Sequence, residues 1–170
     1  MAIIAQNDQG TITNANSYIE TSFADSYFSD RNNTSWSSAS TADKEAAIIK
    51  AWQYIDTAFR FAGYQASDIQ NTEFPRYEIY NQRGNELTGI QVKLKNAQCE
   101  YALIALSQDL TINQTPINTP TIKRKSQKVD VLATDIEYDT SVGQQIRFNY
   151  PQADFWLKDF LQRNTFNGYY

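Results

Sequence analysis

The clearest hydrophobic pattern in the chain lies between Thr41 and Gly63 and predicts a long amphipathic helix. Its apolar side chains recur at spacings of three and four, which places them on one face of an α-helix. They are Ile48, Ile49, Trp52, Ile55, Phe59 and Ala62. Thr41 is suited to cap the N-terminus, and Gly63 to end the helix in the left-handed conformation. We expect the chain to be organised around this helix, with Trp52 as its anchor in the core.

The same period predicts one helix before this segment and one after it. A short helix capped by Thr21 would turn Ala24, Tyr27 and Phe28 inward, and a longer helix would run from about Ile90 to Ser107. The apolar face of the longer helix comprises Ile90, Leu94, Ala97, Tyr101 and Ile104. We expect the two long helices to pack together. The predicted core scaffold is Ile49, Trp52, Ile55, Phe59, Leu94, Tyr101 and Ile104.

Polar segments connect these helices. Trp36 stands alone among polar residues and is expected to pin its loop to the core. Residues 64–89 have no helical period and predict a long surface loop, in which Pro75 fixes its own φ and holds Phe74 extended. Residues 1–15 are rich in Asn, Gln, Thr and Gly, which favours an extended arm whose order depends on a partner.

The pattern changes to β-branched and polar residues in alternation over TIKRKSQKVDVLATDIEYD, which predicts two strands or a long hairpin. The turn would fall near Ser126 to Lys128 or nearer Leu132 to Asp135. A two-stranded ribbon is marginal in water, so it would lean on the helices or on another chain. Pro151 is suited to open a last helix, and Tyr169 and Tyr170 end the chain.

These elements predict a mainly α fold: a small helical bundle with a projecting β-hairpin arm and a C-terminal helix. The whole chain, 1–170, would be one domain. Its parts would be an N-terminal arm over 1–15, the bundle over 16–110, the hairpin arm over 120–140, and the last helix with its tail over 150–170.

Composition narrows the function classes. The chain has 170 residues, no histidine, one cysteine and a net charge of −4. Without histidine there is no Ser-His-Asp or Cys-His nucleophile and no imidazole general base, so catalysis is not expected. The excess of acidic residues gives no overall electrostatic case for nucleic-acid binding. No apolar run is long enough to span a bilayer, so no membrane is expected as a partner. No motif for a cofactor or a metal is present, so neither is expected to bind.

Six segments form a recognisable series along the chain: NANSYIETSFADSYFSDR, the loop tryptophan Trp36, DKEAAIIKAWQYIDTAF, FPR at 74–76, VKLKNAQCEYALIAL and KVDVLATDIEYD. In this order they resemble a family of tailed-bacteriophage head–tail connector proteins, adaptors or head-completion proteins often labelled DnaT-like putative single-stranded-DNA-binding proteins. The likeness covers most of residues 14–162. The family commonly has a tryptophan before the Pro-Arg pair and a proline opening the third helix; this chain has Phe74 and Thr88-Gly89 there.

The resemblance implies a structural head-to-tail adaptor without enzymatic activity. Such a protein would form a dodecameric ring under the portal, extend the channel for packaged double-stranded DNA, and provide a docking surface for the tail. Its partners would be the portal protein, tail or tail-completion proteins and copies of itself. It would be located in the neck of the virion, and in the host cytoplasm during assembly. The alternative is a single-stranded-DNA-binding accessory protein of replication, which a salt-dependent affinity for oligonucleotides would favour.

Candidate contact residues lie in the hairpin and in the tail. Lys123, Arg124, Lys125 and Lys128 form a basic cluster that could be a charged strand edge, a protein contact or a DNA contact. Tyr169 and Tyr170 follow a glycine and are candidates for contacts with the portal or between subunits.

Two further features have a simpler interpretation. Asp135, Glu137 and Asp139 alternate and could share a strand face, which is conceivable for a divalent cation but is more simply a solvated face. Cys99 is expected at the flank of its helix as a small packed residue.

Overall fold

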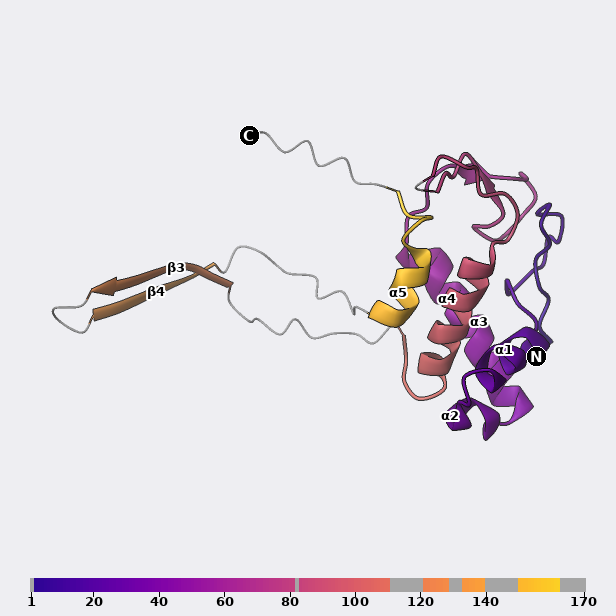
Figure 1. Ribbon diagram of the computed structural model, residues 1–170, viewed down its shortest axis with the longest axis horizontal. Helices are drawn as coiled ribbons and strands as arrows, with labels where there is room; N and C mark the ends of the chain where they lie inside the picture. The colour runs from indigo at the N-terminus through magenta and orange to yellow at the C-terminus, as the bar shows by residue number, and fades with distance from the viewer. Residues whose placement is uncertain (1, 82, 111–120, 129–132, 140–149, 163–170) are drawn as a thin grey trace. The chain divides into compact units, whose positions relative to one another are not determined.

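The computed structural model shows the chain as two compact units, Met1–Thr111 with Tyr150–Tyr170 and Ile112–Asn149 (Figure 1). The structure describes residues 2–81, 83–110, 121–128, 133–139 and 150–162. The first unit holds the helices and is called the helical unit below. The second holds a β-hairpin. The expected fold class, mainly α with a β-hairpin, is confirmed.

The helical unit contains five described helices (Figure 1). They are α1 (Thr21–Ser29), α2 (Thr34–Ser37), α3 (Thr41–Ala58), α4 (Val92–Ala105) and α5 (Pro151–Leu157). Helix α4 packs against α3, α5 and α1, so the expected packing of the two long helices is confirmed. The expected inward residues of α1 are buried as well: Ala24, Tyr27 and Phe28.

Helix α4, rather than α3, is the most buried element of this unit. Its buried positions lie all round the helix and include polar residues: Leu94, Ala97, Gln98, Cys99, Glu100, Tyr101, Ala102 and Ala105. The prediction that the chain is organised around residues 41–63 was therefore wrong. A one-sided apolar stripe marks a helix that packs on one side, whereas a helix enclosed on several sides shows no clear stripe. For the same reason Cys99 lies in the core and not at a flank.

The boundaries of α3 differ from those expected. Ser40 caps the helix, because its hydroxyl accepts a hydrogen bond from the Asp43 amide at 3.2 Å, so Thr41 is the first helical residue and not the cap. The helix ends at Ala58, and Phe59 is already extended with a ψ of 151°. Gly63 has a φ of 65° but belongs to the following loop.

The core contains only part of the predicted scaffold. Ile55, Phe59, Leu94 and Tyr101 are buried, whereas Trp52 and Ile104 are partly buried and pack against the core from outside. Ile49 is likewise only partly buried, and its neighbour Ile48 is fully buried. The tryptophan that anchors the core is Trp36, which is 1% exposed and stacks on Phe28 at 4.7 Å between ring centroids. The expectation that Trp36 pins its segment to the core is confirmed.

The N-terminal segment is folded onto the helical unit without a partner chain, contrary to expectation. The buried Gln6 side chain donates to the Ile12 carbonyl at 3.0 Å and to the Thr72 hydroxyl at 3.1 Å. The Asp8 carboxylate accepts a hydrogen bond from the Ile90 amide at 2.9 Å. A polar composition suggested disorder, but here the polar side chains satisfy backbone groups of this same chain.

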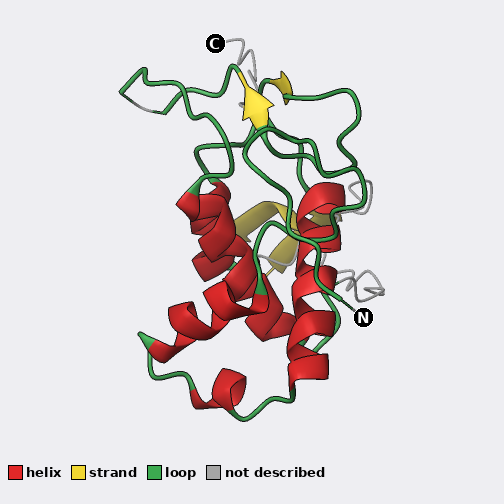
Figure 2. Cartoon of the chain, turned by 90° about the vertical axis from the view of Figure 1, so that its right-hand side faces the viewer, coloured by secondary structure: helices red, strands yellow, loops and turns green. Residues whose placement is uncertain are grey.

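Loops and a short two-stranded ribbon occupy the end of the helical unit away from α2 (Figure 2). Strands β1 (Tyr64–Gln65) and β2 (Arg76–Tyr77) pair antiparallel, with Tyr64 opposite Tyr77. Residues 59–90 otherwise lack helices, as expected, and Phe74 and Pro75 are buried and joined by a cis peptide bond. The ribbon leads into the segment that contributes to the candidate site.

The hairpin unit contains β3 (Thr121–Lys128) and β4 (Ala133–Asp139), which pair antiparallel. The expected hairpin is confirmed, but both suggested turn positions were wrong. Residues 126–128 belong to β3 and residues 133–135 to β4, so the reversal lies between Lys128 and Ala133. A register shift between Ile122 and Arg124 leaves Lys123 as the additional residue of β3.

Candidate nucleic-acid interface

Helix α5 begins at Pro151, as predicted, and is fixed to α4 along its length. The Tyr101 hydroxyl donates to the Asp154 carboxylate, and the Gln152 amide donates to the Glu100 carboxylate at 3.2 Å. Ala153, Leu157 and Phe160 are buried in the core. Beyond the helix, the chain pairs with residues 60–62 through hydrogen bonds between Ala62 and Phe160 and between Gln162 and Arg60. These contacts determine which α5 side chains face outward.

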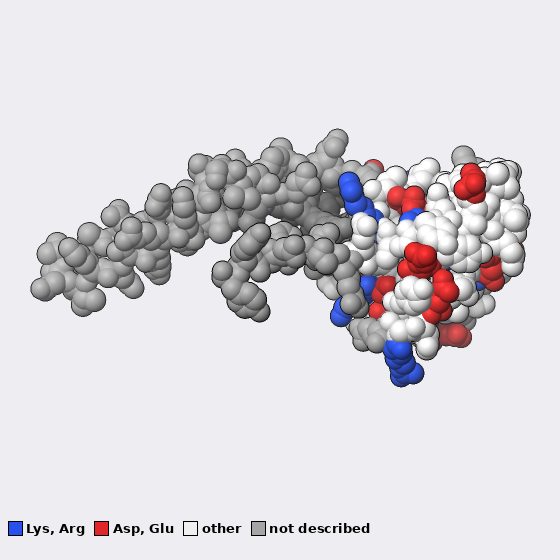
Figure 3. Space-filling view, turned by 90° about the horizontal axis from the view of Figure 1, so that it is seen from above, with Lys and Arg blue, Asp and Glu red and all other residues white. Residues whose placement is uncertain are grey.

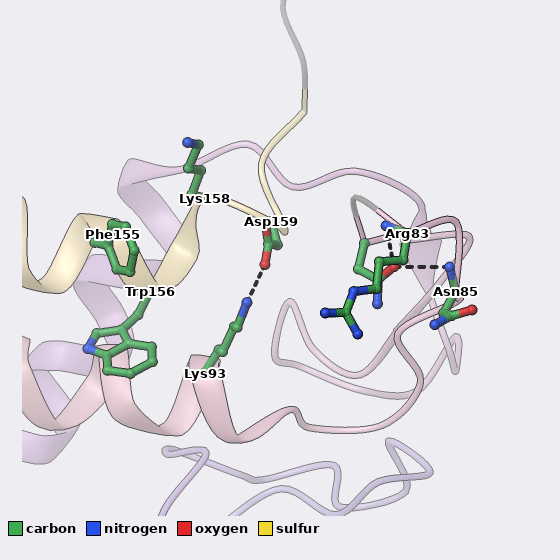
Figure 4. A pocket seen from close by; sticks show the side chains of 8 residues that line it. Arg83, Asn85, Lys93, Phe155, Trp156, Lys158 and Asp159 are labelled. Atoms are coloured by element: carbon green, nitrogen blue, oxygen red, sulfur yellow. Dashed lines mark hydrogen bonds and ion pairs between the residues drawn. The ribbon is translucent and has the colours of Figure 1, made fainter.

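A cleft of about 400 Å³ lies beside the outer face of α5, and we call it the α5 cleft. Its lining comes from three separate segments: the loop after β2, the start of α4, and α5 with the residues that follow it (Figure 4). The lining residues are Asn81, Arg83, Asn85, Lys93, Phe155, Trp156, Lys158 and Asp159.

The aromatic part of the cleft is Phe155 and Trp156. Phe155 is 71% exposed, the largest exposure among the large apolar residues that the structure describes, and Trp156 is partly buried against the core. Their ring centroids are 6.3 Å apart with an interplanar angle of 73°. The outer face of Phe155 is therefore open to an aromatic ligand, while Trp156 forms part of the wall beside it.

The charged part of the cleft is predominantly basic. Arg83, Lys93 and Lys158 are exposed, and Asp159 is the one carboxylate among the lining residues. The Lys93 amine donates to the Asp159 carboxylate at 2.5 Å (Figure 4), and that lysine remains 53% exposed. Asp154, the acidic residue within α5, accepts hydrogen bonds from the Tyr101 hydroxyl and the Tyr150 amide and does not line the cleft. Three cations against one carboxylate leave a local positive excess.

The loop that carries Arg83 has a defined structure. Residues Tyr80 and Glu86 form a bridge, and the Asn81 amide donates to the Asn85 carbonyl at 2.9 Å. The Asn81 side-chain oxygen accepts the backbone amides of Arg83 and Asn85 at 2.9 and 3.0 Å. Arg83 therefore projects from an ordered turn on the opposite side of the cleft from Phe155 (Figure 4).

This combination matches the chemical needs of single-stranded nucleic acid. Unpaired bases stack on exposed aromatic rings, and lysine and arginine neutralise the phosphates of the backbone. An open cleft with an aromatic wall and three cations offers both. The local charge matters here because the face seen in Figure 3 carries both signs on a largely uncharged background.

The residues predicted from the sequence as contacts are not among the described residues that line the α5 cleft. Lys123, Arg124, Lys125 and Lys128 all belong to β3, where Arg124 is opposite Glu137 and Lys125 is opposite Ile136. Tyr169 and Tyr170 lie outside the described residues. Asp135, Glu137 and Asp139 occupy alternate positions of β4. The structure does not test these predicted roles.

The sequence interpretation missed Arg83 and Lys93 as site residues. Lys158 was not among its candidate contact residues either. The missing information was spatial, because packing of α5 on α4 brings Lys93 beside Asp159. The opposite charges of these two residues could have suggested an ion pair, but only if a contact between α4 and α5 had been predicted.

Other types of site find no support in the part of the chain that the structure describes. No group of three or more His, Cys, Asp or Glu side chains there is close enough to share a metal ion. None of the described helices is both long and apolar enough to cross a bilayer. Burial raises the pKa of the Cys99 thiol, which opposes reactivity as a thiolate.

Comparison with protein families identifies a match along nearly the whole chain. A family model described as "Putative DnaT-like ssDNA binding protein" matches residues 1–169. The chain matches no curated protein and no solved structure. The match supports the DnaT-like label but contradicts the head-to-tail adaptor hypothesis, and it favours the alternative of a single-stranded-DNA-binding protein. The portal, the tail proteins and the dodecameric ring that accompanied the adaptor hypothesis gain no support from it.

Proposed function

Because this chain belongs to the DnaT-like ssDNA-binding protein family, we propose that it binds single-stranded DNA and that the α5 cleft is where it does so. The proposed activity is binding without catalysis. The cleft would hold an unpaired base against Phe155 and the adjoining phosphates near Arg83, Lys93 and Lys158.

The observation that carries the proposal is the exposure of Phe155 in a cleft that three cations also line. A phenylalanine at 71% exposure buries little of its ring in its own chain, and here it shares a cleft with the amines of Lys93 and Lys158. Base stacking on an aromatic side chain is worth about 1–3 kcal/mol per base, and it does not depend on sequence because every base has a π-face. The site therefore favours single strands with little discrimination between bases.

The first test is a titration of a fluorescently labelled thymidine oligonucleotide with the full chain, followed by anisotropy at several salt concentrations. Each phosphate neutralised in a single strand contributes about −0.7 to the slope of log K against log salt. Three cations predict a slope of about −2. A duplex of similar length should not benefit from stacking, because its bases are already stacked on one another. Absence of salt-dependent binding to single strands would contradict the proposal.

Variants of the cleft distinguish the contribution of base stacking from that of phosphate attraction. Phe155→Ala should lower affinity for single strands about 5- to 150-fold, corresponding to about 1–3 kcal/mol, and leave the salt slope unchanged. Lys93→Gln or Lys158→Gln should each reduce the magnitude of the slope by about 0.7. Lys50→Gln is the matched control, because Lys50 is exposed on α3 and does not line the cleft. If Lys50→Gln has the same effect as the cleft variants, binding is diffuse and the α5 cleft is not the site.

A further inference from the structure

A second exposed aromatic surface lies on the ribbon formed by β1 and β2. Tyr64 is 54% exposed and Tyr77 is 41% exposed. The two residues are directly opposite each other in the antiparallel register, so they share one face of the ribbon. Their ring centroids are 5.9 Å apart with an interplanar angle of 62°. We call this pair the tyrosine ribbon.

The side chain of a buried arginine and a close backbone contact at a glycine hold the tyrosine ribbon in place. The guanidinium of the buried Arg76 donates from Nε to the Ala62 carbonyl and from a terminal nitrogen to the Gly63 carbonyl, each at 2.8 Å. Its other terminal nitrogen binds the Glu73 carboxylate at 2.6 Å. Gly63 is also required, because a Cβ there would lie 1.9 Å from the Tyr77 carbonyl oxygen. Two exposed rings are thus fixed by a buried charged residue and by a backbone contact that only glycine permits.

Two short stretches of chain connect the tyrosine ribbon to the α5 cleft. After β2, the chain reaches Tyr80, which is 55% exposed and immediately precedes Asn81 in the cleft lining. Before β1, residues 60–62 pair with residues 160–162, which follow Asp159 of the cleft. Both strands of the ribbon are therefore joined by short stretches of chain to residues that line the cleft or adjoin it.

We propose that Tyr64 and Tyr77 form a second stacking platform that extends the binding site of the α5 cleft along the same single strand. This inference rests on the proposed function of the cleft. The occupant is single-stranded DNA because the surface combines exposed rings, rigid support and a short connection to the cleft, and stacking platforms in succession are how single strands are bound without sequence preference.

The charge around the ribbon predicts how its contribution to binding differs from that of the cleft. The charged residues described in segment 60–86 comprise three basic and four acidic side chains: Arg60, Asp68, Glu73, Arg76, Glu78, Arg83 and Glu86. Arg76 is bound to Glu73, and Arg83 belongs to the cleft. The ribbon therefore contributes stacking but no phosphate attraction. Its contribution to affinity should be independent of salt and should appear only with strands long enough to reach it.

The test compares a thymidine oligonucleotide of about 4 nucleotides with one of about 16, the range of site sizes for one single-strand-binding domain. Tyr64→Leu and Tyr77→Leu should each weaken binding of the long strand at least fivefold, with an unchanged salt slope, and leave binding of the short strand unchanged. Tyr64→Phe retains a ring and should bind both strands as the unaltered chain does. Ile69→Ala is the control, because Ile69 is an exposed apolar residue in the same loop segment.

Each outcome decides between the two proposals. If the leucine variants bind the long strand as tightly as the unaltered chain while Phe155→Ala does not, the ribbon is not a platform and the cleft remains the site. If they weaken the short and the long strand equally, the ribbon is not an extension and the inference is wrong. If the unaltered chain binds neither strand, the proposed function fails and the inference fails with it. Circular dichroism of every variant verifies that the helical unit is folded.

Discussion

Asp56 of α3 occupies a position where one carboxylate connects three parts of the helical unit. It accepts a hydrogen bond from the Tyr18 hydroxyl and another from the Glu73 amide, the latter at 3.1 Å. Burial raises the pKa of Asp56 to about 7, and the nearby Glu73 carboxylate adds to the increase, while the hydrogen bonds from Tyr18 and the Glu73 amide oppose it. Burial likewise raises the pKa of Tyr18, with the charge of Asp56 contributing.

This raised pKa predicts that stability falls as pH increases from about 4 to about 7. The folded state retains the proton of Asp56 through this window, whereas the unfolded state loses it near its ordinary pKa of 3.8. The free energy of unfolding therefore decreases as the pH rises through this window and is level once the pH exceeds the pKa of the folded state. A shift of this size corresponds to a loss on the order of 4 kcal/mol. Urea unfolding between pH 4 and 8 measures it. Asp56→Asn should abolish this part of the decrease, and Asp68→Asn, an exposed control, should not. Parallel pH profiles for Asp56→Asn and the unaltered chain would contradict the assignment.

At the level of single residues, the helical period located the right face of α3 but not the buried member of each adjacent pair. Ile48 and Ile49 are both compatible with an apolar stripe, yet only Ile48 is fully buried. The sequence pattern likewise did not show that Trp36 is fully buried whereas Trp52 is only partly buried. Burial depends on what packs opposite a residue, and that information is not contained in the period of one helix.

The burial of polar residues in the centre of α4 could not be predicted, for a related reason. Gln98 is completely buried, and its side chain accepts the Tyr18 amide at 3.0 Å and donates to the Ser17 hydroxyl and the Ile48 carbonyl. Buried Glu100 accepts hydrogen bonds from the Tyr27 hydroxyl at 2.6 Å and from Gln152. Sequence patterns assign such residues to the surface, since a buried polar group is tolerable only when partners from distant segments satisfy it.

At the scale of elements, the two strands of the tyrosine ribbon depend on Arg76 more than on their own ladder, which has only two residue pairs. Arg76→Lys retains the charge but cannot reproduce the forked set of hydrogen bonds to Ala62, Gly63 and Glu73. We expect a loss of about 2–4 kcal/mol in the free energy of unfolding, since hydrogen bonds to charged groups contribute about 1.5–3 kcal/mol each.

Hydrogen exchange should locate this effect at the ribbon. In Arg76→Lys, amides of residues 62–66 should lose protection more than those of α4. The exposed Arg60→Lys is the control and should change neither stability nor exchange. Uniform loss of protection throughout the helical unit would show that Arg76 supports the whole core instead of the ribbon.

At the scale of the whole molecule, net charge does not describe the local surface on which the proposed function depends. The value of −4 argued against a nucleic-acid ligand, but the α5 cleft gathers Arg83, Lys93 and Lys158 from three separate segments. A phosphate responds to charges within about a Debye length, roughly 8 Å at physiological salt. The proposed binding therefore depends on a local cluster that folding creates, and not on the net charge of the chain. The mainly helical fold was predictable from periodicity, whereas the site depends on a tertiary contact between α4 and α5.

The division into two units predicts that the helical unit folds and binds without the hairpin. The described core residues all belong to Met1–Thr111 and Tyr150–Tyr170. Helix α5 is fixed to α4 by its own contacts, and Tyr150, just before α5, packs against Tyr101 at 5.9 Å between ring centroids. Replacement of residues 112–149 by a flexible Gly/Ser linker should therefore leave a single cooperative thermal transition within a few degrees of the original, because loop closure costs only about 0.6 kcal/mol per doubling of loop length.

The same variant determines which basic cluster binds DNA. It removes Lys123, Arg124, Lys125 and Lys128 but leaves the α5 cleft intact. If the cleft is the site, single-strand affinity and the salt slope of about −2 should persist. If the slope collapses while the helical unit remains folded, the hairpin supplies the phosphate contacts, and the DNA interpretation of its basic cluster replaces the cleft. A chain that no longer unfolds cooperatively would instead show that the core of the helical unit requires the hairpin unit.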